Sequence, residues 1–149
     1  MKKVMISLLL LGVLVLSSCA QKPEDLFSAI KDGDLDKVRN MVDLNKDLVN
    51  ARKDNGETPL HEATYQGNLE IINALVQRGA EIDAKKTGGF TPLHIAAQRG
   101  HEDVVDYLLK NRANPSSKDE YGMTPGDVAE RAGHKSIASR LKSADRRSP

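Results

Sequence analysis

Apolar residues recur in adjacent pairs, three to four positions apart, in two segments of this chain. The first segment carries Ile71, Ile72, Leu75 and Val76, and the second carries Val104, Val105, Leu108 and Leu109. This spacing places the side chains on one face of an α-helix, whereas a half-buried strand would alternate residue by residue. Each residue of the second segment lies 33 positions after its counterpart in the first. The pattern therefore predicts two equivalent amphipathic helices.

The 33-residue step extends to other parts of the sequence. It relates "ETPLHEATYQG" to "FTPLHIAAQRG" and then to "MTPGDVAERAG". The residues that recur are Thr58, Thr91 and Thr124; Pro59, Pro92 and Pro125; Ala63, Ala96 and Ala129; Gly67, Gly100 and Gly133. Upstream, "EDLFSAIKDGD" follows the same plan 34 residues earlier, so one extra residue is expected between Asp43 and Asn50. A fixed period of this length indicates a repeat architecture.

The recurring residues have physical roles at the ends of a short helix. A threonine hydroxyl can cap the free N–H groups of the first turn, and a following proline suits the first helical position. Glycine at the far end suits a left-handed C-terminal residue. Turn sequences occur between the helix pairs at Asn55-Gly56, Gly88-Gly89 and Tyr121-Gly122. Arg112 stands where Gly79 stands one repeat earlier, so a strained left-handed residue is expected there.

A 33-residue period with the motif TPLHxA resembles the ankyrin repeat, from Pro23 to about Ala144. The resemblance implies an all-α solenoid of about four helix-turn-helix repeats with β-turn fingers. The expected repeats are 24–56, 57–89, 90–122 and 123–144, followed by a disordered tail at 145–149. In this family the TPLH histidine ties the finger to its helix. The structural residues implied are Thr58, Pro59, His61, Thr91, Pro92, His94, Thr124 and Pro125.

The first and last repeats depart from the pattern. Glu24 replaces the threonine cap, and Phe27 takes the histidine position. In the fourth repeat Gly126 and Asp127 replace Leu-His, and Ser136, Ala138 and Lys142 replace apolar residues. Terminal repeats need a polar outer face, so both are expected to act as caps.

The first 18 residues read as a signal peptide, because Lys2 and Lys3 precede an apolar run from Val4 to Leu16 that is too short to span a bilayer. The sequence "LSSC" that ends at Cys19 resembles the lipobox of bacterial lipoproteins. That resemblance implies a lipid on Cys19 and a tether over residues 19–23. An ordinary cleavable signal with Cys19 nearby is the alternative.

Composition and motifs exclude several classes of function. The net charge of +1 falls to −1 without Lys2 and Lys3, and no clustered basic face indicates nucleic-acid binding. Cys19 is the only cysteine, so a disulfide framework or a CxxC metal or redox site is excluded. No GxSxG, HExxH or P-loop motif occurs. The four histidines recur at repeat positions, so we interpret them as structural and expect no metal, cofactor or small-molecule substrate.

The ankyrin resemblance also implies a protein-binding surface on the fingers and the exposed faces of the first helices. Transferred by register, it comprises Asp54, Asn55, Glu57, Tyr65, Gln66, Thr87, Gly88, Phe90, Gln98, Arg99, Glu120, Tyr121, Met123 and Arg131. Three of the five aromatic residues belong to this set, which favours an anchor patch because aromatic residues and arginine dominate binding hot spots. The alternative is that Phe90 and Tyr121 support neighbouring fingers.

The sequence thus predicts a non-enzymatic, monomeric module that binds a protein partner and attaches to a membrane through its N-terminal lipid. Ala20 after the cysteine resembles outer-membrane sorting, so the expected location is the periplasmic face of the outer membrane. Toxin immunity and scaffolding or protection of an envelope enzyme remain open, as does a surface-exposed or secreted protein acting on host proteins. A hidden hydrolase or metal enzyme is the competing class.

Overall fold

The computed structural model describes residues 22–146, which form eight α-helices and a short 3-10 helix. The expected signal peptide, Cys19 and the last three residues of the chain lie outside this range. The elements are α2 (Pro23–Lys31), α3 (Leu35–Leu44), η1 (Lys46–Asn50), α4 (Pro59–Gln66), α5 (Leu69–Gln77), α6 (Pro92–Arg99), α7 (Glu102–Lys110), α8 (Pro125–Arg131) and α9 (Lys135–Asp145). None of the helices in this range has the length and apolar character that a membrane span requires.

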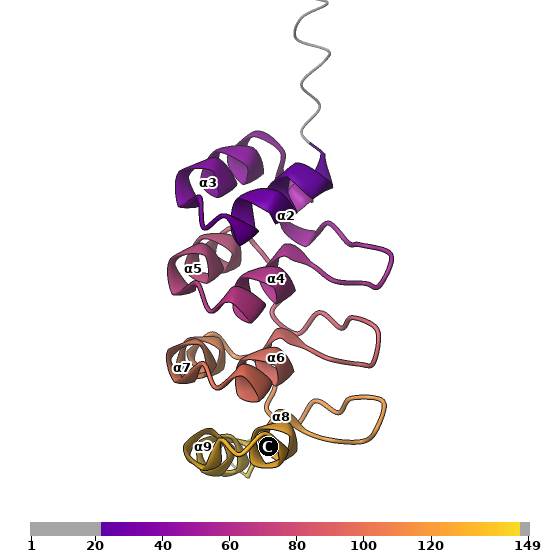
Figure 1. The fold of residues 1–149 in the computed structure, drawn as a ribbon, viewed down its shortest axis with the longest axis vertical. Helices are drawn as coiled ribbons and strands as arrows, with labels where there is room; N and C mark the ends of the chain where they lie inside the picture. The colour runs from indigo at the N-terminus through magenta and orange to yellow at the C-terminus, as the bar shows by residue number, and fades with distance from the viewer. Residues whose placement is uncertain (1–21, 147–149) are drawn as a thin grey trace, which may run out of the picture.

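The helices stack in two parallel rows (Figure 1). The inner row runs α2, α4, α6, α8, with each helix packed on the next, and the outer row runs α3, α5, α7, α9. Loops before α4, α6 and α8 extend away from the outer row as three fingers (Figure 1). The predicted all-α solenoid of helix pairs is confirmed.

The core lies between the two rows and continues from repeat to repeat. Its central leucines, Leu60, Leu75, Leu93 and Leu108, have no exposed surface, and burial of each such side chain stabilises the fold by about 1.5–3 kcal/mol. The recurring alanines Ala63, Ala96 and Ala129 are also fully buried. A methyl side chain there allows the inner helices to approach closely, so the spacing of the repeats depends on these small residues.

The start of the first repeat differs from the expectation. Helix α2 begins at Pro23 with Lys22 as its N-cap residue, so Glu24 lies in the first helical turn and is not the cap. Proline has its φ fixed near the helical value and loses no hydrogen bond at the first position, so it starts the helix earlier than the register of the later repeats predicts. The carboxylate of Asp25 accepts from the Lys22 N–H at 3.4 Å.

The ends of α3 and α9 define two further boundaries. Helix α3 has ten residues where α5 has nine, and η1 follows it, which places the extra residue in the expected segment. Asp145, assigned to the tail by sequence, is the last residue of α9, and its carboxylate contacts the hydroxyl of Ser116.

The residues that depart from the repeat pattern in the terminal repeats differ in their exposure. Phe27 is buried, and Ser136 is exposed on the outside of α9. Ala138 is only 5% exposed and belongs to the core, so it does not contribute to the polar outer face that the sequence predicts. The small side chain retains contact with the core where a larger apolar residue stands in earlier repeats.

Left-handed residues end the helices at the predicted places. Gly67 and Gly100 are the C-cap residues of α4 and α6 with φ of 72° and 76°. Gly133, at φ 86°, follows the C-cap Ala132 by one residue. Arg112 has φ 68° and is the only non-glycine residue with positive φ in residues 22–146, which confirms the expected left-handed site.

Two of these glycines have a second constraint. The His101 ring lies over Gly67 and the His134 ring lies over Gly100, so that an added Cβ would come within 2.8 and 2.6 Å of ring atoms. The His134 Nε2 also hydrogen-bonds the Gln98 carbonyl at 3.2 Å. No atom lies within 4 Å of a Cβ added at Gly133.

The substitutions Gly100→Ala and Gly133→Ala should therefore differ in cost. Gly133→Ala introduces only the strain of a left-handed alanine, about 1 kcal/mol. Gly100→Ala adds displacement of the imidazole and loss of its hydrogen bond, about 1 kcal/mol more. Urea unfolding followed by circular dichroism measures both values. Equal destabilisation would show that the imidazole contact contributes nothing.

Candidate protein-binding surface

In the two middle inner helices, α4 and α6, an imidazole links the helix to the following finger. The His61 Nδ1 accepts from the N–H of Thr58 at 3.2 Å and from its hydroxyl at 2.8 Å. The opposite nitrogen, Nε2, lies 3.0 Å from the carbonyl oxygen of Phe90. Because a carbonyl can only accept, Nε2 carries the proton, and the ring is neutral. The arrangement recurs at His94, whose Nε2 lies 3.1 Å from the Met123 carbonyl oxygen.

Burial determines the protonation state of these two imidazoles. His61 and His94 have no exposed surface. Removal from water lowers the pKa of His61 to about 4 and also lowers the pKa of His94. Residues 22–146 hold no group of three or more His, Cys, Asp and Glu side chains that could hold a metal ion.

In the fourth repeat Asp127 replaces the imidazole. Its carboxylate accepts from the Thr124 N–H at 3.0 Å and from the hydroxyl at 2.8 Å. These bonds hold the pKa of Asp127 below its usual range. Asp127 therefore keeps the N-terminal cap of α8. The predicted TPLH-type threonines and prolines all lie at helix N-termini, at the N-cap and first helical positions of α4, α6 and α8.

The fingers are joined to one another by backbone bonds. Thr87 N–H donates to the Asn55 carbonyl at 2.8 Å, and Glu120 N–H donates to the Gly88 carbonyl at 3.0 Å. Two side chains repeat the link at 33-residue spacing: the Arg52 guanidinium donates to the Lys85 carbonyl at 3.2 Å, and the Lys85 ammonium donates to the Lys118 carbonyl at 3.0 Å. The fingers therefore form one connected layer beside the inner helices.

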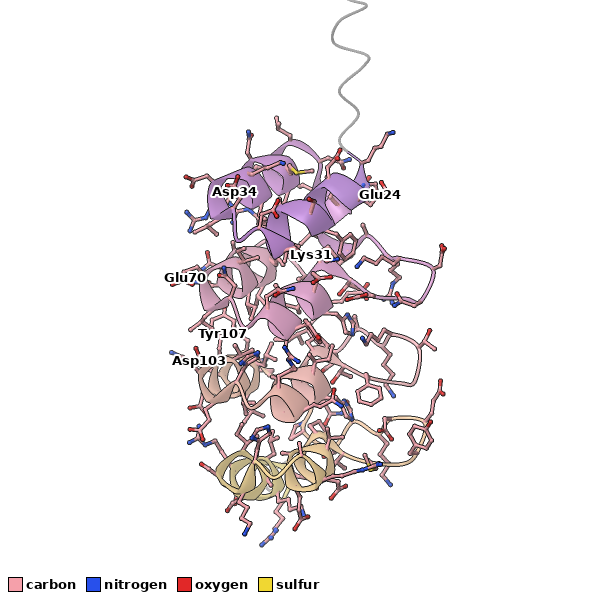
Figure 2. All side chains as sticks on the ribbon, viewed as in Figure 1. Glu24, Lys31, Asp34, Glu70, Asp103 and Tyr107 are labelled. Atoms are coloured by element: carbon pink, nitrogen blue, oxygen red, sulfur yellow. The ribbon has the colours of Figure 1, made fainter. Side chains whose placement is uncertain are left out.

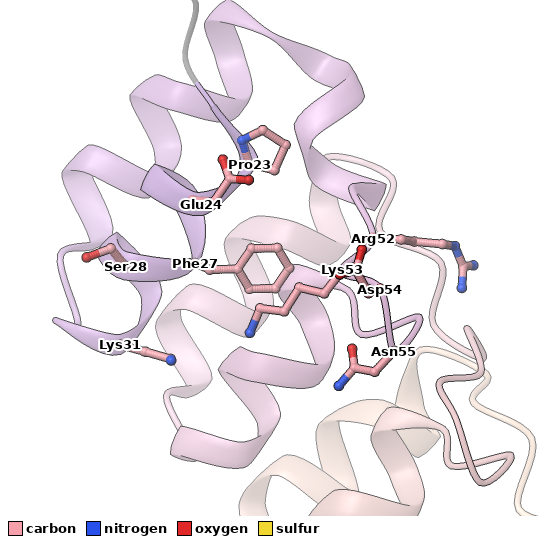
Figure 3. A pocket seen from close by; sticks show the side chains of 9 residues that line it. All are labelled: Pro23, Glu24, Phe27, Ser28, Lys31, Arg52, Lys53, Asp54 and Asn55. Atoms are coloured by element: carbon pink, nitrogen blue, oxygen red, sulfur yellow. The ribbon is translucent and has the colours of Figure 1, made fainter.

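An upper hollow of about 640 Å³ lies between α2 and the first finger. Figure 3 shows the Lys53 side chain lying along the Phe27 ring, with its Nζ 4.2 Å from the ring centroid. The same ammonium lies 3.4 Å from Glu57 and 3.2 Å from the buried Glu62. Lys53 therefore holds the first finger against the inner helices α2 and α4. The remaining residues around the hollow are Pro23, Glu24, Ser28, Lys31, Arg52, Asp54 and Asn55.

A lower hollow of about 330 Å³ lies between α6, α8 and the third finger. Its lining comprises Phe90, Gln98, Asp119, Tyr121, Met123, Val128, Arg131 and Ala132. Tyr121 is 81% exposed at the finger tip. Between the two hollows, the Arg99 guanidinium stacks on the Tyr65 ring at 4.1 Å from its centroid, so that α4 and α6 present a joined aromatic and cationic pair.

The residues predicted from sequence fall into four groups. Asp54 and Asn55 line the upper hollow, and Tyr65 and Arg99 form the central pair. Five line the lower hollow, namely Phe90, Gln98, Tyr121, Met123 and Arg131. The others bond within the surface: Glu57 to Lys53, Gln66 to Glu62, Thr87 to Asn55 and Glu120 to Gly88.

Phe90 and Tyr121, which sequence left open between contact and support, differ in role. The Phe90 ring is partly buried and meets the His94 ring edge to face, with centroids 5.6 Å apart. It therefore supports the imidazole link, whereas Tyr121 is exposed. The fifth aromatic, Tyr107, lies on the outer row among polar residues such as Glu70 and Asp103 (Figure 2), and its hydroxyl donates to the Asn73 side chain at 3.1 Å.

Sequence reasoning missed Phe27 and Lys53 of the upper hollow and Asp119 and Val128 of the lower one. Register alone contained part of the signal, because Lys53 and Asp119 occupy the same repeat position two repeats apart. The contact between Lys53 and Phe27 joins the first finger to α2, and such a pairing of side chains does not follow from the period.

Comparison with known sequences decides the family. The family model described as "Ankyrin repeats (3 copies)" matches residues 6–86, and the one described as "Ankyrin repeats (many copies)" matches 65–109 and 96–141. The chain belongs to the ankyrin-repeat family. The first match begins inside the segment expected to be the signal peptide. Ankyrin repeats are protein–protein interaction modules, and the family assignment supports that general role here.

Curated ankyrin relatives share only short stretches with this chain. An ankyrin repeat protein of Fowlpox virus (strain NVSL) is 37% identical over 59 residues, 40% of this chain and 14% of that protein. A protein named "Probable E3 ubiquitin-protein ligase XBOS32" from Oryza sativa subsp. japonica is 38% identical over 66 residues, 44% of this chain and 13% of its own. A 60 kDa lysophospholipase of Mus musculus is 40% identical over 52 residues, which are 35% of this chain and 9% of that protein. The chain thus spans a small part of the length of these proteins, and the activities that their names state are said of those proteins.

The neutral imidazoles of this ankyrin stack predict a loss of stability at mildly acidic pH. An unfolded histidine binds a proton near pH 6.5, whereas folded His61 does so only near pH 4. Between these values the unfolded chain binds more protons, so acidification favours unfolding. The free energy of unfolding should be level above pH 7 and fall by up to about 3 kcal/mol for His61 between pH 6.5 and pH 4.

Urea unfolding at a series of pH values measures this dependence. The double variant His61→Asn, His94→Asn should be less stable at pH 7 but should lose most of the slope between pH 6.5 and pH 4.5. A wild-type stability that is flat across this interval would contradict the assignment of neutral rings.

Proposed function

We propose that this ankyrin chain is a non-enzymatic module that binds one protein partner through its fingers and inner helices, while a lipid on Cys19 attaches it to the bacterial cell envelope. The proposed location is the periplasmic face of the outer membrane. The observation that carries the binding proposal is that Tyr65, Arg99 and Tyr121 are exposed on a face whose fingers are fixed by hydrogen bonds between repeats.

The geometry of these three residues suits protein recognition. Aromatic residues and arginine dominate binding hot spots, and the Arg99 guanidinium is already stacked on the Tyr65 ring. A side chain ordered before binding loses less conformational entropy when the partner docks. The linked fingers have the same effect on the backbone, because the partner meets a surface that is already formed.

The imidazoles are not free for other chemistry on this face. In His61 and His94 both ring nitrogens are engaged, one by the threonine cap and the other by the next finger. Their burial and neutral state suit them to hold the repeats together rather than to transfer protons or bind a metal. The proposal is accordingly a stoichiometric binding function.

The membrane proposal rests on sequence together with the start of the fold. The sequence "LSSC" precedes Ala20, and helix α2 begins at Pro23. Four residue steps separate Cys19 from Pro23, which allows a reach of roughly 14 Å at full extension. A lipid on Cys19 would therefore hold α2 close to the bilayer. The upper hollow, lined by Pro23 and Glu24, would then lie on the membrane side of the surface.

Crosslinked pulldown from the native envelope with the lipidated protein tests the binding surface. Wild type should capture one protein species in a stoichiometric amount, and the variant Tyr65→Ala, Arg99→Ala, Tyr121→Ala should capture at least tenfold less. Phe90 stays unchanged because it packs on His94. The matched control replaces three exposed residues of the outer row, Arg39→Ala, Gln77→Ala and Lys110→Ala.

The control should capture as much partner as wild type, and both triple variants should keep the wild-type circular dichroism spectrum. Equal capture by wild type and the Tyr65, Arg99 and Tyr121 variant would refute the proposed surface.

The variant Cys19→Ser tests the lipid anchor separately. It should lose metabolic labelling with palmitate and remain as an unprocessed precursor, while its repeat domain unfolds in urea at the wild-type midpoint. The comparison with Ser17→Ala controls for a change beside the cysteine. Wild-type processing and palmitate labelling of Cys19→Ser would rule out lipid attachment at this residue.

A further inference from the structure

The lower hollow contains a buried carboxylate whose hydrogen bonding is incomplete. Asp119 is 6% exposed. Its Oδ1 accepts from the N–H of Tyr121 at 2.9 Å and of Met123 at 2.8 Å. Its Oδ2 is enclosed and has no hydrogen-bond partner among the described residues. Buried polar atoms nearly always have partners, because the water they lose must be replaced. The site therefore lacks a donor.

The second repeat shows what fills the same position elsewhere in the stack. Asp119 lies 66 residues after Lys53 and 33 after Lys86, so lysines occupy its register in the two preceding fingers. The Lys53 ammonium reaches across to the inner helices, where it lies over Phe27 and contacts the carboxylates of Glu57 and Glu62. In the third finger a carboxylate, Asp119, stands at this register position, so the charge there is reversed, although Lys118 directly precedes it.

The wall of the lower hollow is apolar where the second repeat is acidic. Met123 and Val128 stand at the register positions of Glu57 and Glu62, and the Phe90 ring completes the wall. Arg131 lies at the rim with its Nη1 3.9 Å from the Met123 sulfur. Within residues 22–146, no ion pair joins Arg131 to Asp119, so the buried carboxylate has no counter-cation of its own.

We infer that the lower hollow receives a lysine or arginine side chain of the bound partner, whose cationic group donates to Asp119 Oδ2 and whose alkyl stem packs on Phe90, Met123 and Val128. This inference rests on the proposed protein-binding function and gives its surface a specific anchor. The exposed Tyr121 ring at the mouth provides a face for the cation as it enters. Because Oδ2 is enclosed in the free chain, entry requires side chains around the lower hollow to move.

Two small probes test the inference without knowledge of the partner. The first is N-acetyl-lysine methylamide, and the second is N-acetyl-norleucine methylamide, which has the same straight stem without the ammonium group. Each is titrated into the ¹⁵N-labelled full chain while the amide resonances of Gly122, Val128 and Ala132 are followed by NMR. The lysine probe should shift these resonances with a Kd at least fivefold lower than that of the norleucine probe.

The variant Asp119→Asn separates charge from structure. The asparagine oxygen still accepts the two backbone N–H groups, so the finger should keep its turn and the amide spectrum its dispersion. For the Asp119→Asn variant, the Kd of the lysine probe should be about equal to that of the norleucine probe. The matched variant Asp36→Asn, the same change at an exposed site on α3, should keep the wild-type preference.

Each contrary result has a distinct meaning. Equal binding of the two probes, or tighter binding of norleucine, would overturn the inference in favour of an apolar anchor. No binding of either probe would also overturn it and would indicate that Arg131 closes the hollow in solution. Partner capture lost in the Tyr65, Arg99 and Tyr121 variant but retained in Asp119→Asn would refute the lysine anchor alone. Full capture by the Tyr65, Arg99 and Tyr121 variant would instead refute the proposed function.

Discussion

The surface of this protein depends on a hydrogen bond across repeats, in which the imidazole of one inner helix donates to the backbone of the next finger. His61 reaches the Phe90 carbonyl and His94 reaches the Met123 carbonyl, while the same rings accept from the threonine caps behind them. A neutral ring is required, because its two nitrogens must act as acceptor and donor at once. Burial disfavours the charged imidazolium. It therefore keeps each ring in the neutral state that this pair of hydrogen bonds requires.

The chain ends this series in two different ways. At the C-terminal end Asp127 keeps the cap on Thr124 but has no donor for a further repeat, which is sufficient because no described finger follows. At the N-terminal end Phe27 has no polar atoms, and the first finger is held by Lys53 over its ring. Where the interior uses imidazole, the N-terminal end therefore uses a cation–π contact and the C-terminal end keeps only a capping carboxylate. The upper hollow lies beside Phe27, and the lower hollow lies beside the link from His94 to Met123, so the two are at opposite ends of the row of fingers.

The sequence was sufficient for most of the fold because each repeat carries its own signals. Threonine, proline, alanine and glycine at 33-residue spacing specify caps, helix starts, close packing and helix ends, and the left-handed Arg112 followed from its register alone. The N-cap of α2 was predicted at Glu24 but lies two residues earlier, at Lys22, because Pro23 starts the helix and has no counterpart in the later register. The sequence analysis wrongly placed Ala138 on the polar outer face, because an alanine in place of a larger apolar residue suggests an exposed position. The structure shows that this small side chain still packs in the core. The lipid anchor at Cys19 remains a prediction.

The binding surface was harder to predict, for a physical reason. The repeat register predicts where a residue lies on the backbone of each repeat, but it does not predict which groups a long side chain contacts. Lys53 and Asp119 share one register position, yet the first lies over the Phe27 ring of α2 and the second turns back to its own finger. Residues that obey the repeat build the scaffold, and they are the same in each unit because the packing problem is the same. A partner can distinguish one part of a repetitive surface from another only where the repeat is broken. The reversal from lysine to aspartate at residue 119 changes both charge and packing at one such place, and that makes it a point where specificity can arise in an otherwise regular stack.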